Sequence, residues 1–183
     1  MISGPSGAGK GTLIDAILPR FADLALATSA TTRTVRPGET DGEDYHFLSA
    51  DEFERRVVAG DFLEHVEYAG NRYGTLRSEI DHSLAEGESV VVEIELRGAR
   101  AIRAMLPDAI TIFIAPPSPE ALAERLRRRG TDSPESITKR LDESVAELAA
   151  REEFDHVIVN EDVEVAADEL EVVIADALYG TER

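Results

Sequence analysis

A glycine-rich segment near the start of the chain has the residue types of a phosphate-binding loop. Glycines permit backbone torsions that let successive N–H groups curl around phosphate oxygens, and a following helix presents its positive N-terminus to them. Lys10 adds a full positive charge. The usual motif has Ser or Thr directly after the lysine, whereas Gly11 here precedes Thr12. The segment consists of Gly4, Pro5, Ser6, Gly7, Ala8, Gly9, Lys10, Gly11 and Thr12.

Lysine usage separates this segment from an ordinary glycine-rich turn. Lys10 and Lys139 are the only lysines in the chain, beside seventeen arginines. In a chain whose cationic side chains are otherwise almost all arginines, Lys10 provides a compact point charge. Apolar residues precede the loop and a helical pattern follows it, which is the order that a phosphate loop requires. We therefore expect the loop to hold the phosphates of a nucleotide.

Length and composition restrict the class of protein. At 183 residues the chain fits one domain with a sizeable core. A net charge of −18 disfavours broad binding to nucleic acid or to anionic membranes. The chain has no cysteine, which suits a reducing compartment, and no apolar run approaches the roughly 20 residues that span a bilayer. No signal sequence precedes the loop, so we expect a cytoplasmic protein. Whether it is a monomer or a homodimer stays open.

Apolar runs alternate with helical patterns, which predicts an α/β fold with a parallel sheet covered on both faces. Strands are expected at 1–3, 24–28, 90–95, 109–115 and 157–160. Helices are expected at 10–18, 97–106, 119–129, 134–152 and 163–178. Residues 30–88 are more polar and read as an insertion with short strands at 45–48 and 62–66. Ser49 and Glu52 form a capping box for a short helix that Gly60 ends.

The insertion carries a second set of chemical groups. They lie in the segments 29–39, 42–47 and 70–75 and at Glu64 and Tyr68. Taken with the loop, these motifs resemble guanylate kinase over nearly the whole chain. The resemblance implies a single domain, 1–183, with the three-layer P-loop NTPase fold. Its core would span about 1–29, 89–116 and 153–183, its GMP-binding region about 30–88 and its helical lid about 117–152.

The resemblance implies that MgATP phosphorylates GMP, with ATP and GMP as the partners. Arginine forks match phosphate geometry, and tyrosine hydroxyls donate without adding charge. The Glu64 carboxylate can accept hydrogen bonds from the N1–H and the amino group of guanine, a donor pair that adenine lacks. Taken singly, the arginines are better explained as solvated loop charges and the tyrosines as core aromatics, and the combination of motifs reverses this preference. The implied contacts to the GMP phosphate are Ser29, Arg33, Arg36, Tyr45 and Tyr73, and those to the base are Glu64, Thr75 and Glu95.

Two positions depart from the family pattern. Glu95 stands where the family commonly has Asp, which lengthens the arm by one methylene, and Arg97 stands where it often has Gln. Glu93 and Glu95 are two residues apart in a predicted strand, so we expect them to point to the same side at its carboxyl end. Alternatively, both simply begin the following turn.

The resemblance also implies the transfer machinery. Lys10, Arg33 and the lid arginines Arg125, Arg129 and Arg140 would be catalytic, while Asn160 would join the loop in binding ATP, near the adenine. Arg127 and Arg128 have weaker claims. Mg²⁺ is the expected cofactor, with Thr12 or a water-mediated Glu93 as candidate ligands.

Two other functions remain open. One is a kinase acting on ribose 1,5-bisphosphate on the same scaffold, against which Glu64 and Thr75 argue because a sugar phosphate offers them no base. The other is a non-catalytic module that binds phosphorylated peptides. Such modules typically lose the ATP loop, whereas Lys10 and the lid arginines persist here.

Overall fold

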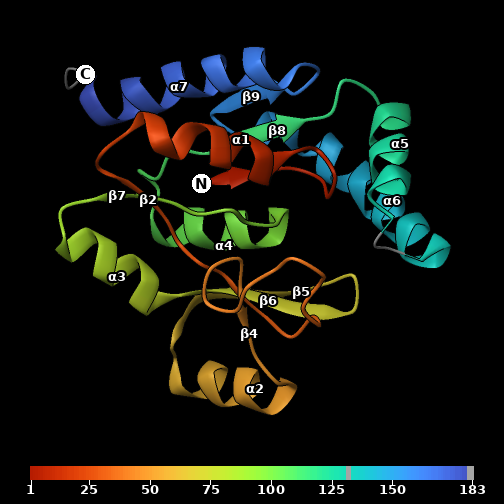
Figure 1. Ribbon diagram of the computed structural model, residues 1–183. Coiled ribbons are helices and arrows are strands. Elements are labelled where there is room, and N and C mark those ends of the chain that lie inside the picture. The colour runs from red at the N-terminus through yellow and green to blue at the C-terminus, as the bar shows by residue number, and fades with distance from the viewer. Residues whose placement is uncertain (131–132, 181–183) are drawn as a thin grey trace. The chain divides into compact units, whose positions relative to one another are not determined.

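The computed structural model describes residues 1–130 and 133–180 (Figure 1). The chain divides into two compact units. The terminal unit comprises Met1–Ala22 and the chain from Ile110 onward, and the central unit comprises Asp23–Ala109. Each unit carries one group of the predicted site residues. Within the described residues, no helix is both long enough and apolar enough to cross a membrane.

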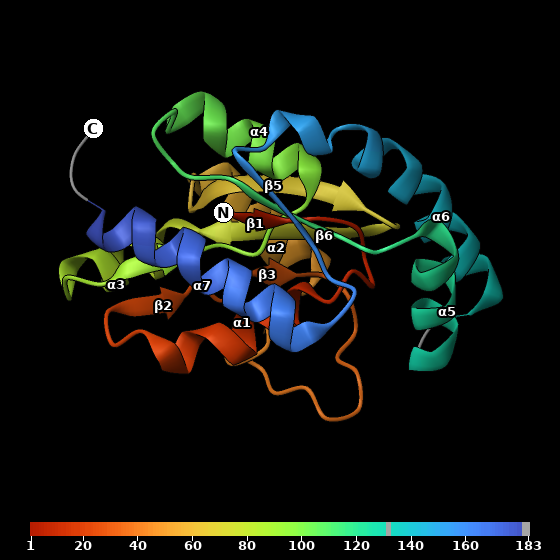
Figure 2. The ribbon, with the colours of Figure 1, turned by 90° about the horizontal axis from the view of Figure 1, so that it is seen from above.

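The terminal unit is built on a parallel sheet with strand order β1-β8-β9. The strands are β1 (Ile2–Ser3), β8 (Ile112–Ala115) and β9 (His156–Val159). All four residues of the middle strand β8 are buried. Helices α1 (Lys10–Ile17) and α7 (Val163–Tyr179) lie side by side (Figures 1 and 2). Each buries an apolar stripe, Leu13, Ile14 and Ile17 in α1 and Ala166, Ala167, Leu170 and Ile174 in α7.

Two further helices of the terminal unit, α5 (Pro119–Arg129) and α6 (Pro134–Ala149), pack against each other (Figure 2). Ser118 and Ser133 cap their N-termini by accepting the N–H groups of Ala121 and Ser136. The predicted bounds of α5 are confirmed. The α-helix α6 ends three residues earlier than predicted, and the 3₁₀ helix η2 (Arg151–Glu153) follows it. Of the predicted connection at 130–133, residues 131–132 lie outside the described part of the chain.

The central unit contains a parallel pair, β2 (Leu24–Leu26) with β7 (Ser89–Val91), and a mixed sheet of order β4-β3-β6-β5. The mixed sheet comprises β3 (Ala30–Thr31), β4 (His46–Phe47), β5 (Phe62–Tyr68) and β6 (Asn71–Leu76). Its helices are α2 (Ala50–Ala59), α3 (Arg77–Ala85) and α4 (Leu96–Met105). Phe53 of α2 stacks on Phe62 of β5 with ring centroids 4.5 Å apart.

Local signals placed α2 correctly. The Ser49 hydroxyl accepts the N–H of Glu52 at 3.1 Å, and Gly60 ends the helix in the left-handed conformation. The first helix, predicted over 10–18, ends as an α-helix at Ile17, and the 3₁₀ helix η1 (Leu18–Arg20) continues from it.

The prediction of one strand over 90–95 is wrong. Strand β7 ends at Val91 because its partner β2 ends at Leu26, and the Ala27 N–H makes the last bond to the Val91 carbonyl. Glu95 is the N-cap residue of α4. The argument that Glu93 and Glu95 share one face of a strand therefore fails.

Candidate functional site

The glycine-rich segment connects β1 to α1 in the terminal unit, as predicted. Two of its glycines are required by close contacts. A Cβ at Gly4 would lie 2.2 Å from the Ile114 carbonyl oxygen, and one at Gly9 would lie 2.3 Å from Asn160 Nδ2. Gly9 also has φ 95° and is the N-cap residue of α1. Because Gly9 has no side chain to accept the first amides of the helix, these amides are available to an anion.

Lys10 lies inside the loop. Its ammonium group donates to the Gly4 carbonyl at 2.7 Å and to the Pro5 carbonyl at 3.4 Å, and the residue is only 7% exposed. The Ala8 N–H closes a turn onto the Pro5 carbonyl at 3.0 Å. Gly11 and Thr12 belong to the first turn of α1, where Thr12 is exposed. The loop therefore gathers one cation, a helix N-terminus and an accessible hydroxyl.

The side chains of Asn160 and Arg125 hydrogen-bond to the backbone of the phosphate loop. The Asn160 amide donates to the Ala8 carbonyl at 2.8 Å, and Arg125 donates to the same carbonyl at 3.2 Å and to the Asn160 carbonyl at 2.8 Å. Asn160 is 1% exposed. This geometry places Asn160 beneath the loop, where it can fix the backbone.

Helix α6 reaches the loop through Arg140, whose Nη1 donates to the Ser6 hydroxyl at 2.7 Å. From α5, Leu122 and Leu126 pack against Gly7. Arg129 is exposed and lies one turn after Arg125 on the same face of α5. Of the three arginines that the resemblance assigns to a lid, Arg125 and Arg140 contact the loop and Arg129 is exposed. Arg127 and Arg128 are exposed as well.

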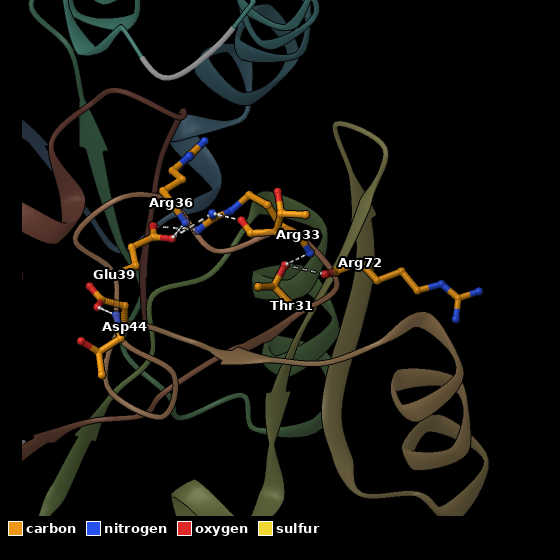
Figure 3. A network of polar contacts seen from close by, with 8 residues as sticks. Thr31, Arg33, Arg36, Glu39, Asp44 and Arg72 are labelled. Atoms are coloured by element: carbon orange, nitrogen blue, oxygen red, sulfur yellow. Dashed lines mark hydrogen bonds and ion pairs between the residues drawn. The ribbon is translucent and has the colours of Figure 1, made fainter.

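In the central unit, Arg33 and Glu39 form the centre of a polar network (Figure 3). Arg33 Nη1 and Nη2 donate to the two oxygens of Glu39 at 3.0 and 2.9 Å, and Glu39 also accepts the Arg36 N–H at 2.7 Å. Burial disfavours both charges, but the ion pair outweighs it, so the pKa of Glu39 is lowered and that of Arg33 is raised. The Arg36 side chain extends away from this pair (Figure 3).

Aromatic rings surround the Arg33 guanidinium. Its central carbon lies 5.3 Å from the Tyr45 ring centroid and 5.5 Å from that of Phe47, within cation–π range. Tyr45 in turn contacts Tyr73 edge-on, with centroids 6.2 Å apart. Burial and then the Glu93 charge raise the pKa of Tyr45, so its phenol stays protonated and able to donate. Ser29 is half-buried at the start of this sheet, and its carbonyl accepts the His46 N–H at 2.9 Å.

A buried carboxylate lies on β5 of the same sheet. Glu64 pairs with Thr75 of β6 across the strands, and the Thr75 N–H and hydroxyl both donate to Glu64 Oε1, at 3.1 and 2.9 Å. Glu64 Oε2 is buried without a hydrogen-bond partner among the described residues. Burial, with the nearby charge of Glu95, raises the pKa of Glu64 to about 7 despite the Thr75 hydrogen bonds, which lower it. The Glu64 carboxylate can therefore accept hydrogen bonds from a polar ligand.

The structure therefore collects the predicted residues in two sets. The loop, Asn160, Arg125 and Arg140 come together in the terminal unit, and Arg33, Tyr45 and Tyr73 come together in the central unit beside Glu64 and Thr75. Glu39 and Phe47 lie in the predicted motif segments but had no predicted role. Glu39 had a visible signal, because it is an acidic residue in the short segment that carries both Arg33 and Arg36.

A phosphate loop between β1 and α1, a parallel sheet and flanking helices define a protein of the P-loop nucleoside triphosphate-binding class. Comparison with a solved structure supports the fold: shikimate kinase from Bacteroides thetaiotaomicron covers 94% of this chain with a TM-score of 0.50 at 20% identity, and the chain covers 95% of it. The family model described as guanylate kinase matches residues 1–177. The chain belongs to the guanylate kinase family. The predicted α/β P-loop fold and the predicted family are thus confirmed.

Individual relatives agree with this assignment. The chain is 49% identical over 180 residues to a guanylate kinase of Trichormus variabilis, covering 98% of this chain and 88% of the relative. It is 51% identical over 170 residues to a guanylate kinase of Frankia casuarinae, covering 93% of this chain and 92% of the relative. The crystal structure of guanylate kinase from Anaplasma phagocytophilum has a TM-score of 0.77 at 32% identity, covering 98% of this chain and 85% of the other.

Proposed function

We propose that this chain transfers the γ-phosphoryl group of ATP to GMP, giving ADP and GDP. The observation that carries the proposal is the buried Glu64 carboxylate held by Thr75, in a chain that also has a phosphate loop with its lysine. Residues 30–88 would bind GMP, and residues 117–152 would form the lid. Ribose 1,5-bisphosphate offers Glu64 no base, and modules that bind phosphorylated peptides typically lose the phosphate loop.

Guanine selection follows from the donors of the base. Its N1–H and exocyclic amino group can both donate to the Glu64 carboxylate, and the Thr75 hydroxyl lies beside the same carboxylate. Adenine has no such donor pair, so it would leave a buried carboxylate unpaired. Such a loss typically costs several kcal/mol in discrimination. Glu95 would contact the amino edge of the base.

The acceptor phosphate would bind where the central unit gathers its arginines and tyrosines. Arg33 is oriented by Glu39 and enclosed by two aromatic rings, so its guanidinium is fixed in advance. Arg36 would supply a second fork. The hydroxyls of Ser29, Tyr45 and Tyr73 would donate to the remaining oxygens without adding positive charge.

The donor phosphates would bind at the loop, from Gly4 to Thr12, with Lys10 as the local cation. Asn160 would contribute to ATP binding through the Ala8 carbonyl that it holds. During transfer an oxygen of the GMP phosphate attacks the γ-phosphorus, and the bond to the oxygen that bridges the β- and γ-phosphates breaks. A general base is not needed because the attacking phosphate is already an anion. Arg125, Arg129 and Arg140 would compensate the charge of the transferring group.

We propose Mg²⁺ as the cofactor that enters with ATP. The described residues contain no cluster of three or more His, Cys, Asp or Glu side chains able to hold a metal ion. Mg²⁺ bound to nucleotide phosphates takes most ligands from phosphate oxygens and water, so it needs few protein groups. The candidate ligand is either the exposed Thr12 hydroxyl or, through water, the Glu93 carboxylate. When bound, Mg²⁺ neutralises charge on the β- and γ-phosphates.

A coupled assay of ADP release tests the proposal, with MgATP and, in parallel, GMP, AMP, CMP, UMP and ribose 1,5-bisphosphate. Turnover confined to guanine nucleotides, and lost in Lys10→Ala, is expected. Turnover with the sugar bisphosphate would assign the chain to that activity instead. A folded protein without turnover on any acceptor would overturn the proposal and make binding of a phosphorylated peptide the next measurement.

A further inference from the structure

Gly98 of α4 lies directly against the Glu64 carboxylate. A Cβ added at position 98 would lie 2.5 Å from Glu64 Oε2, and 2.7 and 2.8 Å from Cγ1 and Cδ1 of Ile94. Real Cβ atoms essentially never approach a neighbour below 3.0 Å. The Glu64 carboxylate, together with the Ile94 side chain, therefore occupies the space that the side chain of any other residue at position 98 would fill.

The backbone at position 98 does not itself call for glycine. Gly98 is inside a helix and is absent from the glycines with positive φ, so alanine could adopt its backbone conformation. A glycine within a helix is less stable than an alanine there. The chain thus keeps an unfavourable helix residue at a place where its missing side chain leaves room for a carboxylate.

The carboxylate is held on two sides. The Thr75 N–H and hydroxyl hold Oε1, and Oε2 lies beside Gly98, buried and without a hydrogen-bond partner among the described residues. Moving Oε2 away from α4 requires Glu64 to rotate, which breaks its alignment with Thr75. Gly98 and Thr75 together fix the orientation of both oxygens.

We propose that Gly98 is a specificity-determining residue that positions the Glu64 carboxylate for two donors at once, the N1–H and the 2-amino group of guanine. The inference rests on the proposed function. Its chemical content is recognition of the 2-amino group, because a purine monophosphate without that group, such as IMP, needs only one donor–acceptor pair. A displaced carboxylate keeps one pair and loses the other.

Gly98→Ala tests this directly. We expect the KM for GMP to rise by about 10- to 100-fold, the effect of one hydrogen bond to a charged group, with a smaller change for IMP. The ratio of kcat/KM for GMP over IMP should fall accordingly, while kcat with GMP and the KM for ATP stay near their original values. Ala101→Ser, which also adds one heavy atom but on the exposed side of α4, is the matched control and should leave all of these quantities unchanged.

A double-mutant cycle separates positioning from a general packing defect. Glu64→Asp withdraws the carboxylate by one methylene, so adding Gly98→Ala in that background should change the KM for GMP by less than about threefold. If Gly98→Ala alone does not fold, it should fold when combined with Glu64→Asp and Ile94→Ala, because these two changes remove all three close contacts of the added methyl group. A triple variant that fails to fold where the Glu64→Asp, Ile94→Ala variant folds would overturn the proposal.

With folded protein, either of two results would overturn this inference alone. One is GMP turnover by the wild type together with a GMP-to-IMP ratio of kcat/KM that Gly98→Ala leaves unaltered. The other is that the effects of Gly98→Ala and Glu64→Asp on the KM for GMP simply multiply. Absence of GMP turnover in the wild type would instead overturn the proposed function, and this inference with it. The wild-type and variant assays therefore distinguish the two failures.

Discussion

Arg33 and Glu39 face each other in a bidentate ion pair in which each guanidinium nitrogen meets one carboxylate oxygen, at 3.0 and 2.9 Å. Glu39 also accepts the backbone N–H of Arg36 and donates its own N–H to the Arg36 carbonyl. The loop that carries both arginines is therefore folded around one carboxylate. That carboxylate compensates Arg33, which is 9% exposed, when no phosphate is bound.

Glu39→Gln should destabilise the empty protein by roughly 2–3 kcal/mol, because it leaves a buried guanidinium with reduced charge compensation. GMP should restore part of this loss, since its phosphate supplies a negative charge to Arg33. The measurement is chemical denaturation with and without saturating GMP. The stabilisation by GMP should be larger in the variant than in the wild type.

Glu54→Gln is the matched control for this prediction. Glu54 pairs with Arg72 on the surface of the same unit, where both side chains are largely solvated and an ion pair contributes little. Its loss should change neither stability nor the response to GMP appreciably. Equal destabilisation of Glu39→Gln with and without GMP would show that Arg33 does not meet the acceptor phosphate.

GMP binding should release about half a proton at pH 7. Glu64 in the empty site has a pKa of about 7 and is half protonated there, whereas guanine donors require the ionised carboxylate. The GMP phosphate contributes little because its second pKa is near 6. Calorimetry in buffers of different ionisation enthalpy measures the release. GMP affinity should therefore decrease as the pH is lowered below 7 and should become nearly constant above it.

Glu64→Gln provides the reference, since the amide has no proton to lose in this range. Its binding enthalpy should depend only weakly on the buffer at pH 7. Proton release of the same size in the variant would assign the titration to another group and contradict the role of Glu64.

The same pKa sets the sign of a stability effect in the empty protein. Glu64 has a folded-state pKa of about 7 against an ordinary 4.5, so its contribution to stability is full below pH 4.5 and is lost as the pH rises through 7. The total loss is on the order of 3 kcal/mol. Glu64→Gln removes this loss. Denaturation at pH 5 and at pH 8.5 should show the variant gaining on the wild type at the higher pH.

Arg125 and Arg129 should behave differently although they share one face of α5. Arg125 donates to two backbone carbonyls at the phosphate loop, so Arg125→Ala should lower both the melting temperature and the affinity for ATP. Arg129 is exposed, and Arg129→Ala should lower kcat by on the order of 10³ with the melting temperature unchanged. Melting curves and kinetics on both variants are the measurements.

Arg128→Ala, which alters a neighbouring exposed arginine with a weaker claim to the site, serves as the control. It should leave kcat within a fewfold of the wild type. Equal kinetic defects in Arg128→Ala and Arg129→Ala would point to a general charge effect of α5 rather than to a role of one residue.

Local signals predicted much of the fold. Helix α5 has the expected bounds because Ser118, Pro119 and Gly130 each act on their own backbone. Helix α3 was missed because its N-cap is Leu76, whose side chain has no acceptor to mark a helix start. The end of β7 depends on where β2 ends, more than 60 residues earlier in the chain, and no pattern within 90–95 records that.

The candidate site divides in the same way. The phosphate loop and the arginines Arg33 and Arg36 can be recognised as motifs in the sequence. The contact of Gly98 with Glu64 instead joins two residues 34 positions apart, and neither segment alone indicates it. The position of Asn160 beneath Ala8 joins residues 152 positions apart. Identifying such pairs requires the packed structure, because only packing decides which distant side chains meet.

The scarcity of lysine makes this chain unusually simple to label. Lys10 is enclosed by the carbonyls of its own loop, while Lys139 is exposed on α6. An amine-reactive dye applied briefly would attach to Lys139 much faster than to the enclosed Lys10, and peptide mapping would separate this product from labelling of the Met1 α-amino group, whose pKa is lowered by burial to about 6. A dye at that position would report by fluorescence whether α6 moves on nucleotide addition, with no engineered cysteine and no change to the phosphate loop.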